Sequence, residues 1–319
     1  MNVLEHLSTV LAELVRADAR RVLLGEDIRE GGMLGLSRAA AEDPALAKRL
    51  LALPLAPSTL PAHAAGLALA GMRPIVLLSS AGALVDGLSA LREAALLPWR
   101  TGGERSVPLL FVAPSGPGFG LGGDAVEGPE AILCRVPGLR VVSIGSARQA
   151  SALLRAAAEF WAGEEPTLLL LPRTIALQTI DDGEAALTRP FGSPHMVREG
   201  TQATVFAWGE CVELAAAAVE RSGYDVGVVD VECLAPLQRA ALVESAKLTG
   251  KIVIAHSGPR DHGVGAELAA LFSDAAILHL DAPITRVSGL DAPLRRDEEA
   301  RATPALEELA TAITHVATY

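Results

Sequence analysis

Two short segments of the 319-residue chain have residue types that could do chemistry. Residues 118–123 read Gly-Phe-Gly-Leu-Gly-Gly and satisfy the GxGxxG pattern, whose backbone amides can cradle a phosphate. Two features argue against dinucleotide binding. The acidic residue that would bind a ribose is absent at 141–144, about 20 positions after the motif, and Gly128-Pro129 occupies the position where a helix should begin. We therefore favour a glycine-rich surface loop and keep a nucleotide loop as the alternative.

Glu26 and Asp27 form the second segment, directly after the apolar run 22–25. Ligands of parallel α/β sheets bind beyond the carboxyl ends of the strands, so these carboxylates could face a ligand, or Asp27 could cap a helix. His256 and His262 flank a turn and could reach a substrate, although satisfied or solvated histidines are the favoured interpretation. Three widely spaced cysteines and no HExxH or CxxC motif predict reduced thiols and no metal site.

The elements that must position these residues alternate between apolar, β-branched runs and Ala/Leu-rich helical stretches, which indicates buried parallel strands. In the first half we predict strands at 21–25, 74–79, 107–112, 140–144 and 167–171, and helices at 4–16, 60–70, 83–95 and 147–161. In the second half we predict strands at 203–208, 225–231, 251–256, 276–280 and 285–287, and helices at 211–222, 237–249, 264–272 and 304–315.

Between the two halves the alternation stops. Residues 173–201 have little periodicity and contain Asp181-Asp182-Gly183, two prolines and further glycines. Structureless loops beyond about 15 residues are uncommon within one domain, so this segment reads as a linker. The fold class predicted is α/β, with two three-layer α/β domains in series and mostly parallel sheets: residues 1–175, a linker at 176–200, and residues 201–319.

Composition excludes several classes of partner. The net charge of −11 repels polyanions, so we expect neither nucleic acid nor an anionic membrane as a partner. No apolar stretch approaches the ~20 residues of a membrane-spanning helix, and the start of the chain lacks a signal-peptide pattern, so a cytoplasmic protein is expected. Six Phe, three Trp and two Tyr are few for this length, and Asn2 is the single asparagine.

Several segments, taken in order, resemble one family. They are Leu23-Leu24-Gly25-Glu26-Asp27-Ile28, Ala70-Gly71-Met72-Arg73-Pro74, Thr101-Gly102-Gly103, Ser106-Val107-Pro108, Pro137-Gly138-Leu139-Arg140-Val141-Val142, and His256-Ser257-Gly258-Pro259-Arg260 through Gly263-Val264-Gly265-Ala266-Glu267. From about residue 3 to 317 the chain resembles the β subunit of the thiamine-diphosphate-dependent decarboxylating component of 2-oxo acid dehydrogenase complexes, of pyruvate, branched-chain or acetoin type. The resemblance implies a pyrimidine-binding domain followed by a transketolase C-terminal domain.

In that family the cofactor lies between two subunits, and an α-type partner holds the diphosphate and its Mg²⁺ with a GDG motif and an Asn. This chain has no GDG, so the resemblance implies no metal ligands here and a required α-type partner. The β subunit forms the aminopyrimidine pocket, which by resemblance falls on seven positions: Glu26, Leu55, Pro57, Ser79, Gly82, Asp124 and Ala125.

Three of the family's pocket features are missing. The family's Pro-Ile-Ser-Glu, whose carboxylate bonds the pyrimidine, reads Pro54-Leu55-Ala56-Pro57, and no acid occurs between Pro44 and Val85. The family's aromatic pair falls on Ser79 and Gly82. Its Ala-Gln-His-Ser loop becomes Gly123-Asp124-Ala125-Val126, whereas Glu26 retains a strand-end carboxylate.

These losses predict a β-type subunit of a heterotetramer built on a β–β dimer, with an eroded thiamine diphosphate pocket and with no activity or an altered one. Its catalytic residues are unassigned. It would bind thiamine diphosphate with Mg²⁺ at the shared interface if active, or no cofactor otherwise, and an acyltransferase core or carrier domain is a further candidate partner. The alternative is an active subunit that decarboxylates a 2-oxo acid oxidatively with replacement residues. A stand-alone enzyme that binds a nucleotide on loop 118–123 is a third interpretation.

Overall fold

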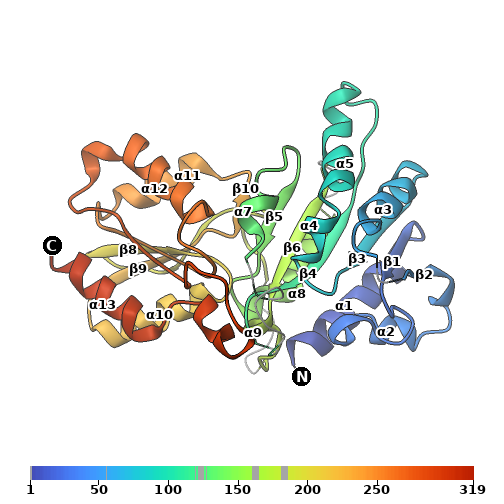
Figure 1. Ribbon diagram of the computed structural model, residues 1–319, viewed down its shortest axis with the longest axis horizontal. Coiled ribbons are helices and arrows are strands. Elements are labelled where there is room, and N and C mark those ends of the chain that lie inside the picture. The colour runs from blue at the N-terminus through green and yellow to red at the C-terminus, as the bar shows by residue number, and fades with distance from the viewer. Residues whose placement is uncertain are drawn as a thin grey trace.

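The computed structural model describes residues 2–54, 56–118, 120, 126, 128–159, 165–180 and 186–319. Two sheets stand side by side, one formed mostly by the first half of the chain and one by the second (Figure 1). Both are mostly parallel and carry helices on their faces, so the two-domain α/β fold class is confirmed. No helix in the described part of the chain is long and apolar enough to cross a bilayer.

The first sheet has seven strands in the order β10-β5-β6-β4-β3-β1-β2. Six strands from the first half are parallel, whereas β10, from the second half, runs antiparallel to β5 at the edge. Their bounds are β1 (Arg21–Gly25), β2 (Leu50–Ala52), β3 (Arg73–Leu77), β4 (Leu110–Ser115), β5 (Arg140–Ser143), β6 (Thr167–Pro172) and β10 (Cys233–Ala235).

Alternate residues of these strands face two apolar clusters, because side chains of a strand point to opposite faces. Leu23 packs with the helices of one face, and its neighbours Val22 and Leu24 pack with those of the other. The first face carries α1 (Val3–Ala17), α2 (Arg38–Ala41), α8 (Ala150–Glu159) and α9 (Arg173–Ala176). The second carries α3 (Leu60–Leu69), α4 (Ala83–Asp86), α5 (Leu88–Arg100) and α7 (Glu130–Leu133).

The second sheet has five strands in the order β12-β11-β8-β9-β7, and β7 is antiparallel to β9. The strands are β7 (His195–Arg198), β8 (Ala203–Ala207), β9 (Val226–Asp230), β11 (Ile252–His256) and β12 (Thr285–Ser288). Helices α10 (Cys211–Ser222) and α13 (Leu306–Ala317) cover one face, and α11 (Arg239–Lys247) and α12 (Val264–Ala275) the other. One continuous core joins this second face to the first sheet, because Phe206 and Phe272 belong to the same cluster as Phe111.

Short 3-10 turns complete the chain at η1 (Met33–Gly35), η2 (Ala47–Arg49), η3 (Ala147–Gln149), η5 (Ile277–His279) and η6 (Arg296–Ala302). The strand predicted at 276–280 is therefore wrong. Ile277 is 56% and Leu278 94% exposed, so the apolar run never enters a sheet. Strands β2, β7 and β10 were not predicted, and β7 lies inside the segment expected to be linker.

The helix predicted at 83–95 is divided in two at Gly87. A Cβ on Gly87 would stand 2.7 Å from the Pro61 ring and 2.9 Å from the Pro57 carbonyl oxygen. Because α3 and the segment after β2 pack this closely on the start of α5, only glycine fits there.

Helix α1 begins at a capping box. The Asn2 side chain accepts a hydrogen bond from the Glu5 amide at 2.8 Å, and the Glu5 carboxylate accepts one from the Asn2 amide at 3.1 Å. The single asparagine of the chain therefore has a structural task.

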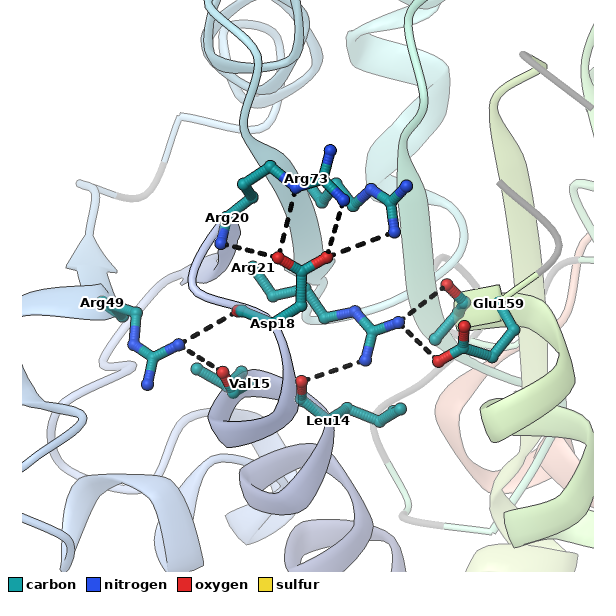
Figure 2. A network of polar contacts seen from close by, with 9 residues as sticks. Leu14, Val15, Asp18, Arg20, Arg21, Arg49, Arg73 and Glu159 are labelled. Atoms are coloured by element: carbon teal, nitrogen blue, oxygen red, sulfur yellow. Dashed lines mark hydrogen bonds and ion pairs between the residues drawn. The ribbon is translucent and has the colours of Figure 1, made fainter. Parts of the chain in front are cut away.

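An arginine-rich network ties the far end of α1 to the amino-terminal edge of the first sheet (Figure 2). Arg21, 2% exposed, donates to the Leu14 carbonyl at 3.0 Å and pairs with Glu159 at 2.5 Å. Arg20 and Arg73 each approach the Asp18 carboxylate at 3.2 Å. Arg49 donates to the Asp18 carbonyl at 3.1 Å and to that of Val15, which satisfies carbonyls that the helix end leaves open. The charged side chains of Asp18, Arg20, Arg21, Arg73 and Glu159 therefore each take part in at least one ion pair.

Candidate functional site

The carboxyl ends of β1, β2 and β3 meet at one edge of the first sheet. Gly25 of β1 is level with Ala52 of β2 and Leu77 of β3. Beyond the strands, the Leu53 amide donates to the Gly25 carbonyl at 3.0 Å, and the Ala81 amide donates to the Pro114 carbonyl at 2.8 Å. Parallel strands bring their following residues together, so Glu26, Pro57, Ser79 and Gly82 lie at this edge.

Glu26 is half-buried at the end of β1. Burial raises the pKa of its carboxyl above the usual value, and the neighbouring Asp27 carboxylate raises it further. Among the described residues, no hydrogen bond reaches the Glu26 side chain. Asp27 is exposed with φ at +48°, and its carbonyl accepts the amides of Glu30 and Gly32. Asp27 thus forms a turn and caps no helix.

The other predicted pocket positions bring little chemistry to this edge. Pro57 and Gly82 have no side-chain donor or acceptor, and Ser79 contributes one hydroxyl. All three are half-buried. Leu55, Asp124 and Ala125 lie outside the described residues, as do Phe119 and 121–123 of the GxGxxG segment.

The start of the loop after β4 is held by α9 of the first half and by residues of the second half of the chain. The buried guanidinium of Arg173 donates to the Gly116 carbonyl at 2.6 Å, and the Gly118 amide donates to the Glu299 carboxylate at 2.7 Å. Gly116 has φ at +68°, and a Cβ there would stand 2.7 Å from an oxygen of Glu210. The loop that leads to Asp124 and Ala125 therefore leaves the sheet from a fixed point.

Glu210, directly before α10, is the centre of this contact between the halves. Its carboxylate accepts hydrogen bonds from the Ser257 hydroxyl and, at 3.5 Å, from Thr303. Burial raises the pKa of Glu210, and these hydrogen bonds and Arg173 oppose the rise. Burial likewise raises the pKa of Glu130, the first residue of α7, to about 7, and Glu210 adds to the effect.

The two histidines flanking a turn have different surroundings. His256 ends β11, is 2% exposed and stacks on Trp208 with ring centroids 4.9 Å apart. Its Nδ1 lies 2.9 Å from the Ser257 carbonyl, which can only accept, so Nδ1 is the protonated nitrogen. His262 is exposed, with φ at +59°. Both border a cavity between the two halves, about 440 Å³ in volume.

Three potential metal ligands are close together at the second sheet, although the sequence predicted no metal site. Ligand atoms of His195, Asp230 and Glu232 lie within 4.8 Å of one another. The Glu232 carboxylate, however, pairs with Arg189 and accepts the Gly192 amide at 2.7 Å. A guanidinium thus already supplies the positive charge, and the group is explained as a buried ion-pair network.

Sequence reasoning missed Arg173, Glu210 and Glu130. Arg173 directly follows β6 and Glu210 comes three residues after β8, and a position just after an apolar strand is the signal that identified Glu26. Glu130 follows Gly128-Pro129 and carries no such signal, because only the tertiary fold places it between the halves.

Two family models match the chain: "Transketolase, pyrimidine binding domain" over residues 1–177 and "Transketolase, C-terminal domain" over residues 192–307. The chain is 30% identical over 299 residues to the 2-oxoisovalerate dehydrogenase subunit beta of Bacillus subtilis, covering 92% of this chain and 90% of that protein. It is 31% identical over 294 residues to the pyruvate dehydrogenase E1 component subunit beta of Leifsonia xyli, covering 90% and 86%.

Among solved structures, a split-gene transketolase described as an inactive β4 tetramer superimposes with a TM-score of 0.78 at 22% identity, covering 100% of this chain and 98% of that one. Transketolase from Leishmania mexicana gives a TM-score of 0.70 at 17% identity, covering 99% of this chain and 45% of that one. At these identities the structural likeness supports the fold alone.

Proposed function

Since the chain belongs to the family of E1 β subunits of 2-oxo acid dehydrogenases, a thiamine-diphosphate-related family, we propose that it pairs with an α-type subunit and supplies a chemically depleted half of a shared cofactor site. The assembly would be a heterotetramer built on a β–β dimer. The resulting complex would have no decarboxylase activity, or an altered one that depends on the partner.

One observation supports the proposal: the described residues after β1, β2 and β3 offer an aminopyrimidine few of the groups that the resemblance implies. The pyrimidine-bonding carboxylate that the resemblance implies falls on Pro57, and the two aromatic contacts fall on Ser79 and Gly82. Glu26 is the remaining strand-end carboxylate at the matched positions. A charge-assisted hydrogen bond contributes about 1.5–3 kcal/mol, so losing the Pro57-position carboxylate alone should weaken cofactor binding by roughly 10- to 150-fold.

Calorimetric titration of thiamine diphosphate and Mg²⁺ into the complex with the α-type subunit tests this proposal. We expect no binding in the micromolar range and no decarboxylation of pyruvate or branched-chain 2-oxo acids. Micromolar binding together with ordinary 2-oxo acid decarboxylation would contradict it.

A second candidate function is an active decarboxylating subunit that relies on Glu26. Its support is the raised pKa of that half-buried carboxyl, since such shifts are common at catalytic positions. The substitution Glu26→Ala, made in the co-expressed complex, distinguishes these two candidate functions. Loss of 2-oxo acid turnover favours the active subunit, whereas an unaltered low background favours the depleted site.

A further inference from the structure

The cavity between the two halves lies away from the edge at which Glu26, Ser79 and Gly82 meet. Its walls are α7 and the segment before it, the turn after β11, the start of α12, and residues 290–294. At about 440 Å³ it has the size of a pocket for a small ligand. Trp208, Val264 and Leu290 are among its apolar lining residues, as is Ile132, which is 47% exposed.

The charges that border this cavity are acidic. Glu130, Asp261 and Asp291 line it, whereas its described lining includes no lysine or arginine. Asp261 and Asp291 are exposed on the rim, so solvent screens their carboxylates. Glu130 is half-buried, and its carboxylate lies in a less polar medium than those of the rim, so it would act at short range.

Gly128 leaves room for the Glu130 carboxylate, and Gly258 lies against Gly128. A Cβ on Gly128 would stand 2.5 Å from a Glu130 oxygen and 3.7 Å from the Cα of Gly258. Gly258, with φ at +79°, comes from the opposite half of the chain. A side chain at Gly128 would meet this carboxylate and displace it, so the absence of a Cβ at this position lets the carboxylate lie here.

We infer that this cavity binds a small primary ammonium compound with a compact aliphatic body. The carboxylate of Glu130 would accept the ammonium N–H groups, and the apolar walls would enclose the aliphatic part. Trp208 adds an aromatic ring to the lining, and aromatic rings attract cations. A carboxylate ligand would meet three acids and, in the described lining, no lysine or arginine, so the same lining disfavours anions.

Binding should depend on pH through Glu130, whose pKa of about 7 would fall when an ammonium group pairs with it. Affinity should therefore rise about tenfold from pH 6 to pH 8, as the free carboxyl goes from roughly one-tenth to nine-tenths ionised.

The groups that face Glu130 shape this dependence. Glu210, before α10, raises its pKa. The thiols of Cys134 and Cys211 lie near it, and burial raises the pKa of both, so they remain neutral in this range. At the end of β11, burial lowers the pKa of His256, and the exposed His262 of the following turn borders the same cavity.

The test is calorimetric titration of the full chain with isopentylamine, and with isopentyl alcohol and isovalerate as neutral and anionic counterparts. We expect the amine to bind at pH 8 at least tenfold more tightly than either counterpart. Glu130→Gln should weaken amine binding about tenfold and abolish its pH dependence. Glu267→Gln, an exposed carboxylate on α12 paired with Arg239, is the matched control and should change neither.

A second variant, Ile132→Trp, fills the cavity without changing any charge and should lower amine affinity at least fivefold. Because Ile132 is half exposed, this variant should fold even if Glu130→Gln does not. Equal binding of the amine, alcohol and carboxylate, no amine binding at millimolar concentration, or unchanged binding in Ile132→Trp would each overturn the inference.

Discussion

The amino-terminal and carboxyl-terminal ends of the strands in the seven-stranded sheet differ in how many partners their charged side chains have. At the amino-terminal edge, Arg21 and Asp18 are each bonded to more than one partner (Figure 2). At the carboxyl-terminal edge, Glu26 has no side-chain hydrogen bond among the described residues, and Pro57 offers no polar side-chain atom. The charged groups of the first edge stabilise the fold, whereas the second edge can be altered at little cost to stability.

The largest effect on stability is expected from Arg21→Met. The substitution removes a buried guanidinium and leaves the carbonyls of Leu14 and Ala158 without this donor. Stability should fall by about 2–4 kcal/mol, measured by urea denaturation. Arg20→Met, at a side chain 56% exposed, is the control and should cost less than about 1 kcal/mol. Equal effects of the two would contradict the larger contribution expected from the buried guanidinium of Arg21.

The next effect tests the depleted edge by restoring a carboxylate. Pro57→Glu in the complex with an α-type subunit should tighten thiamine diphosphate binding by about 1.5–3 kcal/mol, the range for one charge-assisted hydrogen bond. Ala56→Glu, one position earlier, is the matched control. If Pro57→Glu leaves binding unchanged while Ala56→Glu improves it, the assignment of this position is wrong.

A smaller effect is expected at Asp18. Hydrogen bonds from Arg20 hold the pKa of Asp18 below its usual value, with further help from Arg73. Asp18 therefore contributes stability above its unfolded pKa of about 4, and that contribution is lost as the pH falls through the folded pKa. Asp18→Asn should cost about 1 kcal/mol at pH 7, and the difference from wild type should shrink below pH 4. A difference that persists undiminished at pH 2 would show that charge is not its source.

The smallest effect is expected at Glu26. The pKa of Glu26 is shifted upward, opposite to that of Asp18, because the ionised side chain is disfavoured in the fold. The native state therefore loses stability as the pH rises above the pKa of the unfolded state. Glu26→Gln should raise stability at pH 7 by a few tenths of a kcal/mol, up to about 1 kcal/mol, and should be neutral at pH 4. Thermal unfolding at the two pH values measures this, and destabilisation at pH 7 would reveal a bonding partner for Glu26.

Long periodic elements were predictable from the sequence, whereas short strands were not. The helix predicted at 211–222 has those bounds in the structure, because its apolar stripe is set locally. Strands β2 and β10 have three residues each, too few for a period, and both depend on partners distant in the sequence. The break at Gly87 likewise depends on Pro61 and Pro57, which pack against it in three dimensions.

In the candidate site, too, some residues were predictable from the sequence and others were not. Glu26 could be identified because a carboxylate directly after a buried strand lies at the carboxyl edge of a parallel sheet. The cavity beside Glu130 could not, since it exists only where α7 of one half meets the turn after β11 of the other.

Strand β10 has a consequence for how the protein forms during synthesis. Its residues, Cys233–Ala235, belong to the second half of the chain but complete the edge of the first sheet beside β5. While a ribosome has translated only the first 200 residues, β5 is an open edge whose backbone groups can pair with another nascent chain. The emerging first half therefore stays vulnerable to misassembly until residue 235 leaves the exit tunnel. A fragment ending near residue 200 should keep β5 as an unpaired, aggregation-prone edge strand.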